Sequence, residues 1–186
     1  MSRKYKFHNP NAAYFISFAV INWIDVFTRE AYFNVITDSL DYCRKNKGML
    51  LFAYCIMPSH IHLIFRDDNE NPSGLLRDFK GFTSKKMIES IIAHPKESRR
   101  EWMLSMFKRA GEKNSNIKNY QFWQQNNHPI ELWSPHVIKQ KVNYIHNNPV
   151  KAGLVTKPWE WKHSSAKNYA ALDAVIEIDA IGFWDR

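Results

Sequence analysis

Two apolar segments separated by a two-residue break constrain the fold of this chain more than any other feature. Residues 49–57 (MLLFAYCIM) and 60–66 (HIHLIFR) each have the length and composition of a strand, and Pro58-Ser59 interrupts them. So short a connection predicts an antiparallel hairpin. The first segment is apolar enough to be a central strand, and residues 14–20 (YFISFAV) predict one more strand for the same sheet.

Helical patterns alternate with these strands. Thr28 is a candidate cap for a helix over 28–46, which Lys47-Gly48 would end, and Ser134-Pro135 is a strong start for a helix that Pro149 would end. The chain therefore predicts one α+β domain over residues 1–186, with an antiparallel sheet and flanking helices. The remaining expected elements are a helix over 72–92, a helix and then a loop over 94–118, and short strands at 120–124 and 175–178.

The most specific local pattern is His60-Ile61-His62, at the start of a predicted strand. Side chains alternate along a strand, so the two imidazoles point to one face and Ile61 points into the core. Two histidines one pleat apart can bind one metal ion. An isolated HxH pattern is more often two ordinary surface histidines, but neutral rings at the mouth of an apolar strand need polar partners, and a cation supplies them.

The helix that begins at Ser134-Pro135 carries one tyrosine away from its apolar face. Ile138, Val142 and Ile145 are spaced to form a core stripe, whereas Tyr144 falls about 120° from it. Tyr144 shares that polar side with Lys141 and Asn148. A half-buried tyrosine with its hydroxyl in water would give the same pattern, so this feature alone identifies no nucleophile.

Positive charge is concentrated in the middle of the chain. The net charge is +8, and residues 71–118 hold 11 basic and 5 acidic side chains. Clustering of this kind favours a nucleic-acid partner over an ordinary solvated surface. The 15% aromatic content supplies core rings, with a minority available to stack on unpaired bases. The candidate phosphate contacts are Lys80, Lys85, Lys86, Arg99 and Arg100.

Several other classes of protein are excluded or disfavoured. The chain contains no HExxH, paired CxxC or GxxxxGK[ST] motif, and its two cysteines make no disulfide framework. No signal peptide is recognisable, and the longest apolar run is shorter than the roughly 20 residues that span a bilayer. We therefore expect a cytoplasmic protein with no membrane segment.

Two distant segments together resemble a known family. Residues 54–65 (YCIMPSHIHLIF) and 144–155 (YIHNNPVKAGLV) are similar to the single-tyrosine HUH transposases of small, IS200-like insertion sequences, and most similar to the REP-associated tyrosine transposases. The resemblance extends over about residues 14–170, and leaves the acidic tail from 170 to 186 without a counterpart. Shorter agreements are FKGFTSKK (79–86), FWQ (122–124) and HSSAKNY (163–169).

The resemblance implies a ferredoxin-like fold with the HUH motif on a central strand, and cleavage and rejoining of single-stranded DNA beside a hairpin. It makes His60 and His62 ligands of Mg²⁺ or Mn²⁺, Asn148 the third ligand and Tyr144 the nucleophile of a 5′-phosphotyrosine intermediate. Lys141, on the same helix face as Tyr144, is a further candidate contact for nucleic acid. Some members exchange the tyrosine helix between subunits, so a homodimer with a shared site is one arrangement to test.

Two alternatives remain at this point. One is a non-catalytic relative that only binds hairpin DNA, although His60, His62 and Tyr144 are all present. The other is a zinc-structured nucleic-acid protein that uses Cys55 together with the two histidines.

Overall fold

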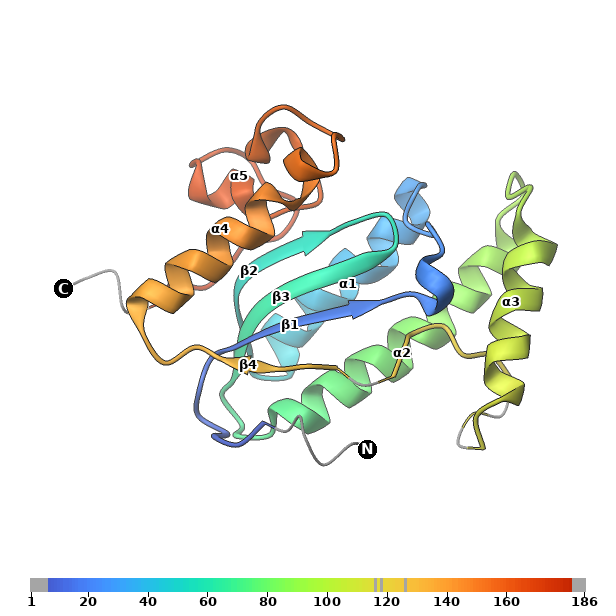
Figure 1. Cartoon of the computed structure of the whole chain (residues 1–186), viewed down its shortest axis with the longest axis horizontal. Coiled ribbons are helices and arrows are strands. Elements are labelled where there is room, and N and C mark those ends of the chain that lie inside the picture. Colours follow the sequence, from blue (N-terminus) through green and yellow to red (C-terminus); the bar gives the residue numbers. More distant parts are fainter. Residues whose placement is uncertain (1–6, 116, 118, 126, 182–186) are drawn as a thin grey trace.

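A four-stranded antiparallel sheet forms the centre of the molecule (Figure 1). The computed structural model describes residues 7–115, 117, 119–125 and 127–181. The fold is α+β, as predicted, with the spatial strand order β2-β3-β1-β4. The strands are β1 (Tyr14–Ala19), β2 (Met49–Ile56), β3 (His60–Asp67) and β4 (Ile130–Glu131).

The predicted hairpin is confirmed, and β3 lies between β2 and β1. Tyr54 pairs with Leu63 across the hairpin, and Ile56 pairs with Ile61 next to the turn. The expectation that residues 49–57 form a central strand is wrong, because β2 is at the edge of the sheet. β2 is apolar for another reason. Helices α1 (Glu30–Asn46) and α4 (Pro135–Lys151) cover its two faces, and residues near the C-terminal end of the chain cover its free edge.

Backbone groups from the C-terminal part of the chain pair with this edge. The amide of Ile56 donates to the carbonyl of His163, and the amide of Ser165 donates to the carbonyl of Tyr54. Further along, the amide of Asp179 donates to Leu51. These bonds protect an otherwise open edge. The strand expected at 175–178 does not form, and only the neighbouring Asp179 makes a backbone bond to β2 at this end of the described chain.

The helices include α1 (Glu30–Asn46), α2 (Pro72–Ala93), α3 (Arg100–Glu112) and α5 (Ala166–Tyr169), with short 3-10 turns η1 (Ile21–Trp23) and η2 (Pro158–Glu160). Thr28 does not cap α1, since the cap position is Arg29, and the Thr28 hydroxyl accepts a hydrogen bond from Arg99 instead. None of the helices in the described part of the chain is long and apolar enough to span a membrane.

Helix α4 (Pro135–Lys151) begins as predicted, with the Ser134 hydroxyl accepting from the amide of Val137 at 3.3 Å. The prediction that Pro149 ends it is wrong, because the helix continues to Lys151. Pro149 is buried inside the helix and removes one helical hydrogen bond, but it does not end the helix. The expected strand at 120–124 is reduced to an isolated bridge between Val20 and Trp123.

The two faces of the sheet are covered differently. Helices α1 and α2 pack on one face, against side chains that include Ile61, Leu63 and Phe65 of β3. Helix α4 packs on the other face, which includes Phe15 and Ile64 (Figure 1). The alternation along β3 places His60 and His62 on the α4 face. The predicted separation of the histidines from Ile61 is therefore confirmed.

Candidate active site

The two histidines lie where β3 leaves the hairpin turn. The amide of Met57 donates to the carbonyl of His60 at 2.8 Å, which closes the turn and fixes the start of the strand. His60 is half-buried and His62 is only 3% exposed. Their ring centroids are 4.8 Å apart, with the planes at 86°. Two imidazoles on one face of the sheet are thus close together, as the sequence predicted.

His62 is a buried polar side chain without a polar partner. Neither of its ring nitrogens has a hydrogen bond to any described residue. Burial, and to a smaller extent the neighbouring His60, lowers the pKa of His62 to about 3, and burial also lowers the pKa of His60. Both rings are therefore neutral near pH 7, which is the form that binds metal ions. Buried polar atoms without partners are rare in folded proteins, so His62 suits a bound cation. His60, whose Nδ1 is 3.2 Å from the Ser59 hydroxyl, lies next to it.

Tyr144 approaches the histidines from α4. Its helix is held to the sheet by the stripe of Ile138, Val142 and Ile145, all of which are buried as predicted. Tyr144 lies outside this stripe and is 41% exposed. Its ring centroid is 5.4 Å from that of His62. A single chain therefore brings the tyrosine and the histidine pair together.

Asn148 lies one helical turn after Tyr144 and faces the same place. Its side-chain nitrogen donates to the backbone carbonyl of Tyr144 at 2.7 Å, so its amide oxygen is left for another group. That side chain is close enough to His62 to raise the pKa of the imidazole, although no hydrogen bond joins them, and the larger effect of burial outweighs it. Asn148 is not the cap of α4, because the cap position is Ala152.

Two lysines surround the tyrosine ring. The ammonium of Lys141 is 4.8 Å from the centroid of Phe15 and 5.8 Å from that of Tyr144. The ammonium of Lys151 is also 5.8 Å from the Tyr144 ring. Sequence reasoning found Lys141 but missed Lys151, which lies beyond the proline expected to end the helix. It also missed Phe15, whose ring is 5.9 Å from His62, because strand pairing alone places it there.

The basic residues of α2 lie on the opposite side of the sheet from the histidines. Lys85 and Lys86 are exposed and pair with Glu89. Lys80 uses two of its three N–H groups inside the protein, donating to the carbonyl of Gln124 at 3.0 Å and to the Asn127 amide oxygen at 2.7 Å. Burial lowers the pKa of Lys80 to about 8.

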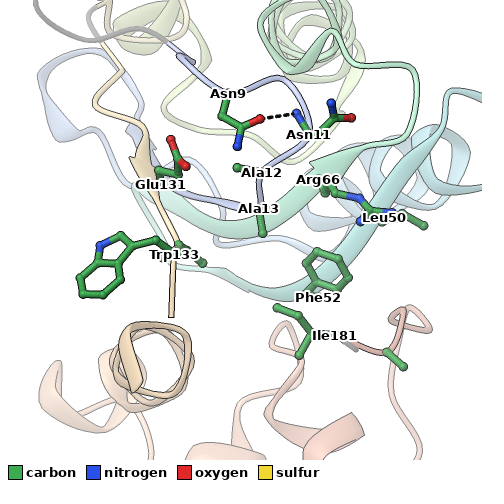
Figure 2. A pocket seen from close by; sticks show the side chains of 12 residues that line it. Asn9, Asn11, Ala12, Ala13, Leu50, Phe52, Arg66, Glu131, Trp133 and Ile181 are labelled. Atoms are coloured by element: carbon green, nitrogen blue, oxygen red, sulfur yellow. Dashed lines mark hydrogen bonds between the residues drawn. The ribbon is translucent and has the colours of Figure 1, made fainter. Parts of the chain in front are cut away.

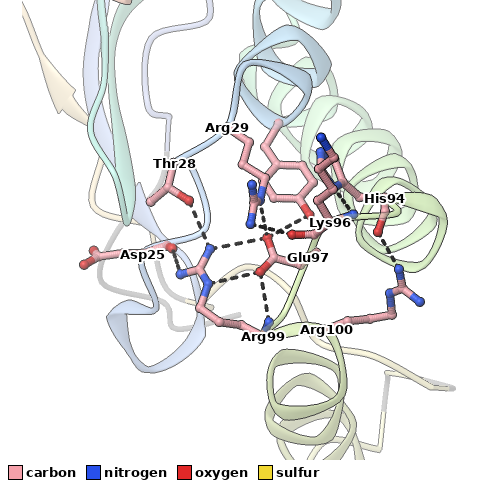
Figure 3. A network of polar contacts seen from close by, with 9 residues as sticks. Asp25, Thr28, Arg29, His94, Lys96, Glu97, Arg99 and Arg100 are labelled. Atoms are coloured by element: carbon pink, nitrogen blue, oxygen red, sulfur yellow. Dashed lines mark hydrogen bonds and ion pairs between the residues drawn. The ribbon is translucent and has the colours of Figure 1, made fainter.

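Arg99 and Arg100 belong to a network between α1, α2 and α3 (Figure 3). The centre of the network is Glu97, whose carboxylate accepts from Arg29 at 2.8 Å and from Arg99 at 3.2 Å. Arg99 also donates to the backbone carbonyl of Asp25 at 2.8 Å, and Arg100 donates to the carbonyl of His94. Both arginines therefore have partners within the protein that their sequence pattern did not indicate.

A pocket of about 600 Å³ opens at the other end of the α4 face (Figure 2). It is lined by Ala13 next to the start of β1, whereas His60 pairs with Ala19 at the end of that strand. The pocket is thus separated from the histidines by the length of β1. Cys55, a third candidate ligand in the zinc hypothesis, is fully buried, and among the described residues no group of three His, Cys, Asp or Glu side chains can hold a metal. That hypothesis is therefore not supported.

Comparison with known proteins identifies the class to which this fold and site correspond. A family described as "Transposase IS200 like" matches residues 10–121, more than half of the chain, and the protein belongs to this transposase family. The match includes both histidines and ends before Tyr144, so it carries no information about the tyrosine.

One solved structure gives a consistent result for the fold. The chain is similar to a REP-associated tyrosine transposase bound to a REP hairpin, with a TM-score of 0.65 and 15% identity over 100% of this chain and 96% of that one. It also matches a putative transposase from Deinococcus radiodurans R1, with a TM-score of 0.45 and 19% identity over 79% of this chain and 95% of that one. A comparison with curated proteins gave no match.

Proposed function

We propose that this transposase is a metal-dependent endonuclease and strand transferase for single-stranded DNA, with Tyr144 as its nucleophile. The observation that carries the proposal is the distance of 5.4 Å between the rings of Tyr144 and His62, which come from opposite sides of the same site. A solvent-accessible phenol beside two neutral imidazoles is the arrangement that attack on a metal-bound phosphodiester requires.

The residues at the site suit a divalent cation. His60 and His62 offer ring nitrogens, and Asn148 offers a neutral amide oxygen from the tyrosine helix. Mixed nitrogen and oxygen donors are compatible with Mg²⁺ or Mn²⁺. When bound, such an ion would neutralise negative charge on the phosphate and polarise its phosphorus. The three side chains would also link β3 to α4 through one centre.

In the proposed step one ester bond to phosphorus replaces another, so the phosphorus remains a diester throughout. The Tyr144 oxygen forms a bond to phosphorus as the bond from phosphorus to the 3′ oxygen breaks. The phenolic proton leaves to solvent and the departing 3′ oxygen takes up a proton, which gives a free 3′-hydroxyl and a 5′-phosphotyrosine. Attack by another 3′-hydroxyl reverses the step, so strands are rejoined without an external energy source.

The substrate is DNA with an unpaired segment, and we infer a neighbouring hairpin because the similar solved structure is of a transposase bound to a REP hairpin. Lys141 and Lys151, beside the Tyr144 ring, are placed to contact phosphates of the strand being cut. The exposed Lys85 and Lys86 of α2 would contact duplex DNA further from the cut. One chain supplies the whole site, so homodimerisation is not needed to complete it.

The test is covalent capture. The full chain is incubated with Mn²⁺ and a labelled DNA hairpin flanked by single-stranded extensions, and adducts are separated on a denaturing gel. We expect an adduct with the wild-type chain, none with Tyr144→Phe, and unchanged DNA binding. Tyr42→Phe is the matched control, because Tyr42 is 55% exposed on α1, on the other side of the sheet.

The outcomes separate the proposal from its alternative. An adduct that persists in Tyr144→Phe would assign the nucleophile to another tyrosine. Tight binding of the hairpin by the wild-type chain with no adduct would favour a non-catalytic DNA-binding relative.

A further inference from the structure

An exposed tryptophan lies beside the histidine pair, on the side away from α4. Trp23, in the η1 turn after β1, is 57% exposed, and its ring centroid is 5.2 Å from that of His60. The two ring planes are inclined at 67°, so they are not stacked. A large part of the indole therefore remains free next to a candidate metal ligand.

The backbone under this side chain is strained. Asn22 and Trp23 both have positive φ, at 53° and 56°. Asparagine adopts this left-handed conformation with some frequency, but a bulky aromatic residue does so rarely. Single exposed apolar side chains are common and need no explanation. A tryptophan held in an unfavourable backbone conformation at the edge of a site does, because such strain is concentrated at functional positions.

The surrounding loop is rigidly attached, which allows it to hold the strain. The amide of Ile21 donates to Phe122 at 2.8 Å, and that of Phe27 donates to Pro58 at 2.9 Å. Arg99 donates to the carbonyl of Asp25 at 2.8 Å (Figure 3). Ile24, directly after the tryptophan, is buried. The indole is therefore presented on a fixed support rather than on a loose loop.

Charge around the site distinguishes the two sides of the histidine pair. Asp25 is exposed and close enough to His60 to raise the pKa of that imidazole against the effect of burial. A carboxylate there repels phosphate. The lysines that attract phosphate, Lys141 and Lys151, are on the other side, next to Tyr144. A strand crossing the site would thus place its backbone toward Tyr144 and an uncharged base toward Trp23.

We propose that Trp23 is a stacking platform for the unpaired base next to the phosphate that is cut. The proposal rests on the proposed function, since it assumes that single-stranded DNA passes the histidine pair. Flat indole faces stack on any base, so Trp23 would position the strand and fix which phosphate faces Tyr144, with little sequence preference.

The experiment uses a DNA hairpin with a single-stranded extension, selected from a randomised pool by binding to the full wild-type chain. 2-Aminopurine, whose fluorescence falls when it stacks, replaces one base at a time along the extension. Binding and fluorescence are measured with Tyr144→Phe as the background, so that the DNA stays intact. The variants added to that background are Trp23→Ala, Trp23→Gly and Trp23→Phe, with Trp102→Ala as control, because Trp102 on α3 is similarly exposed at 52%.

We expect Trp23→Ala and Trp23→Gly to weaken binding by roughly tenfold or more, the usual effect of losing one base–aromatic stack. Both should abolish quenching at one position, the nucleotide next to the cleaved bond, while Trp23→Phe retains part of it and Trp102→Ala changes neither. Trp23→Gly also tests the strain, because glycine tolerates positive φ. Its melting temperature should exceed that of Trp23→Ala. If this more stable variant still loses DNA binding, the loss comes from the missing indole and not from unfolding.

Three results would overturn the platform in distinguishable ways. If the wild-type chain forms its covalent adduct but Trp23→Ala binds and quenches as well as the Tyr144→Phe background, the platform is wrong and the proposed function stands. If no hairpin can be selected and no adduct forms, the proposed function fails and the platform fails with it. Quenching confined to bases remote from the cut would also overturn it.

Discussion

The two faces of the sheet are built from the same strands but present different side chains. On the α1 and α2 face, Ile61, Leu63 and Phe65 of β3 are apolar. The Thr83 hydroxyl there donates to the carbonyl of Phe79 at 2.8 Å and accepts from the Trp123 indole at 3.0 Å, and the buried Tyr54 hydroxyl has no partner among the described residues. On the α4 face, His62 is equally buried yet has no partner among the described residues. The first face stabilises the fold, whereas the second brings the histidine pair and Tyr144 together at the site for which we propose a divalent cation.

Neighbouring residues of β3 test this contrast most strongly. Ile61 is fully buried under α1 and α2, so Ile61→Ala should lower the free energy of unfolding by about 2–5 kcal/mol and leave Mn²⁺ affinity unchanged. His62→Ala should reduce Mn²⁺ affinity by more than roughly 100-fold, with a smaller loss of apo stability. Urea unfolding and calorimetry measure the two quantities. Equal loss of stability in both variants would remove the distinction between the faces.

The Glu97 network should give the helical face a characteristic acid sensitivity. Burial alone would raise the pKa of Glu97, but hydrogen bonds from Arg29 and Arg99 outweigh it and lower the pKa to about 2. A depressed carboxyl pKa stabilises the fold above the unfolded value and is lost as the pH falls through the folded value. The contribution, up to about 3 kcal/mol, should therefore disappear between about pH 4.5 and pH 2.

Glu97→Gln tests that assignment. The variant should be less stable than the wild type at pH 7, and the difference should shrink steadily below pH 4.5 in thermal or urea unfolding. Mn²⁺ binding at the other face should not change. A stability difference that is independent of pH would show that packing, and not the ionised carboxylate, is responsible.

Asn148→Ala examines how the α4 face is joined to the metal. Loss of one of three proposed protein ligands should weaken Mn²⁺ binding about tenfold, which corresponds to about 1.4 kcal/mol. Apo thermal stability should be nearly normal, because Asn148 is half-buried and bonds only its own helix in the described contacts. Asn147→Ala is the matched control, since the Asn147 amide donates in the same way to Asn143. Lost stability with unchanged metal affinity would make Asn148 structural.

The smallest effect is expected from the exposed lysines of α2. Replacing Lys85 and Lys86 by Ala should weaken binding of all DNA sequences by a similar small factor. The slope of log affinity against log salt should fall by about one for each phosphate contact removed. Lys80→Ala should instead cost stability, since that ammonium is already bonded to Gln124 and Asn127. An unchanged slope for the double variant would confine the DNA to the α4 face.

Local patterns in the sequence were sufficient for the parts of the site that depend on one element. The period of two along β3 set His60 and His62 on one face and Ile61 on the other. The helical period placed Ile138, Val142 and Ile145 in the core and left Tyr144 outside it. These features could be predicted because each depends on the geometry of a single strand or helix.

Features that depend on pairing between distant segments could not be predicted in this way. Apolar content suggested that β2 is central, whereas it is an edge strand whose free backbone groups are covered by residues 163–165 and by Asp179. The approach of Phe15 to His62 follows from the pairing of β1 with β3, and Lys151 reaches Tyr144 because α4 continues past Pro149.

The chain's sequence by itself therefore determined which residues share a face and which side chains stand apart from the core. Only the tertiary structure decided which faces meet: the tyrosine helix over the histidines, the basic helix on the reverse side, and the strained Trp23 beside His60. The physical reason is that periodicity is imposed by local backbone geometry, whereas strand order and helix placement depend on long-range hydrogen bonds and burial that no single segment encodes.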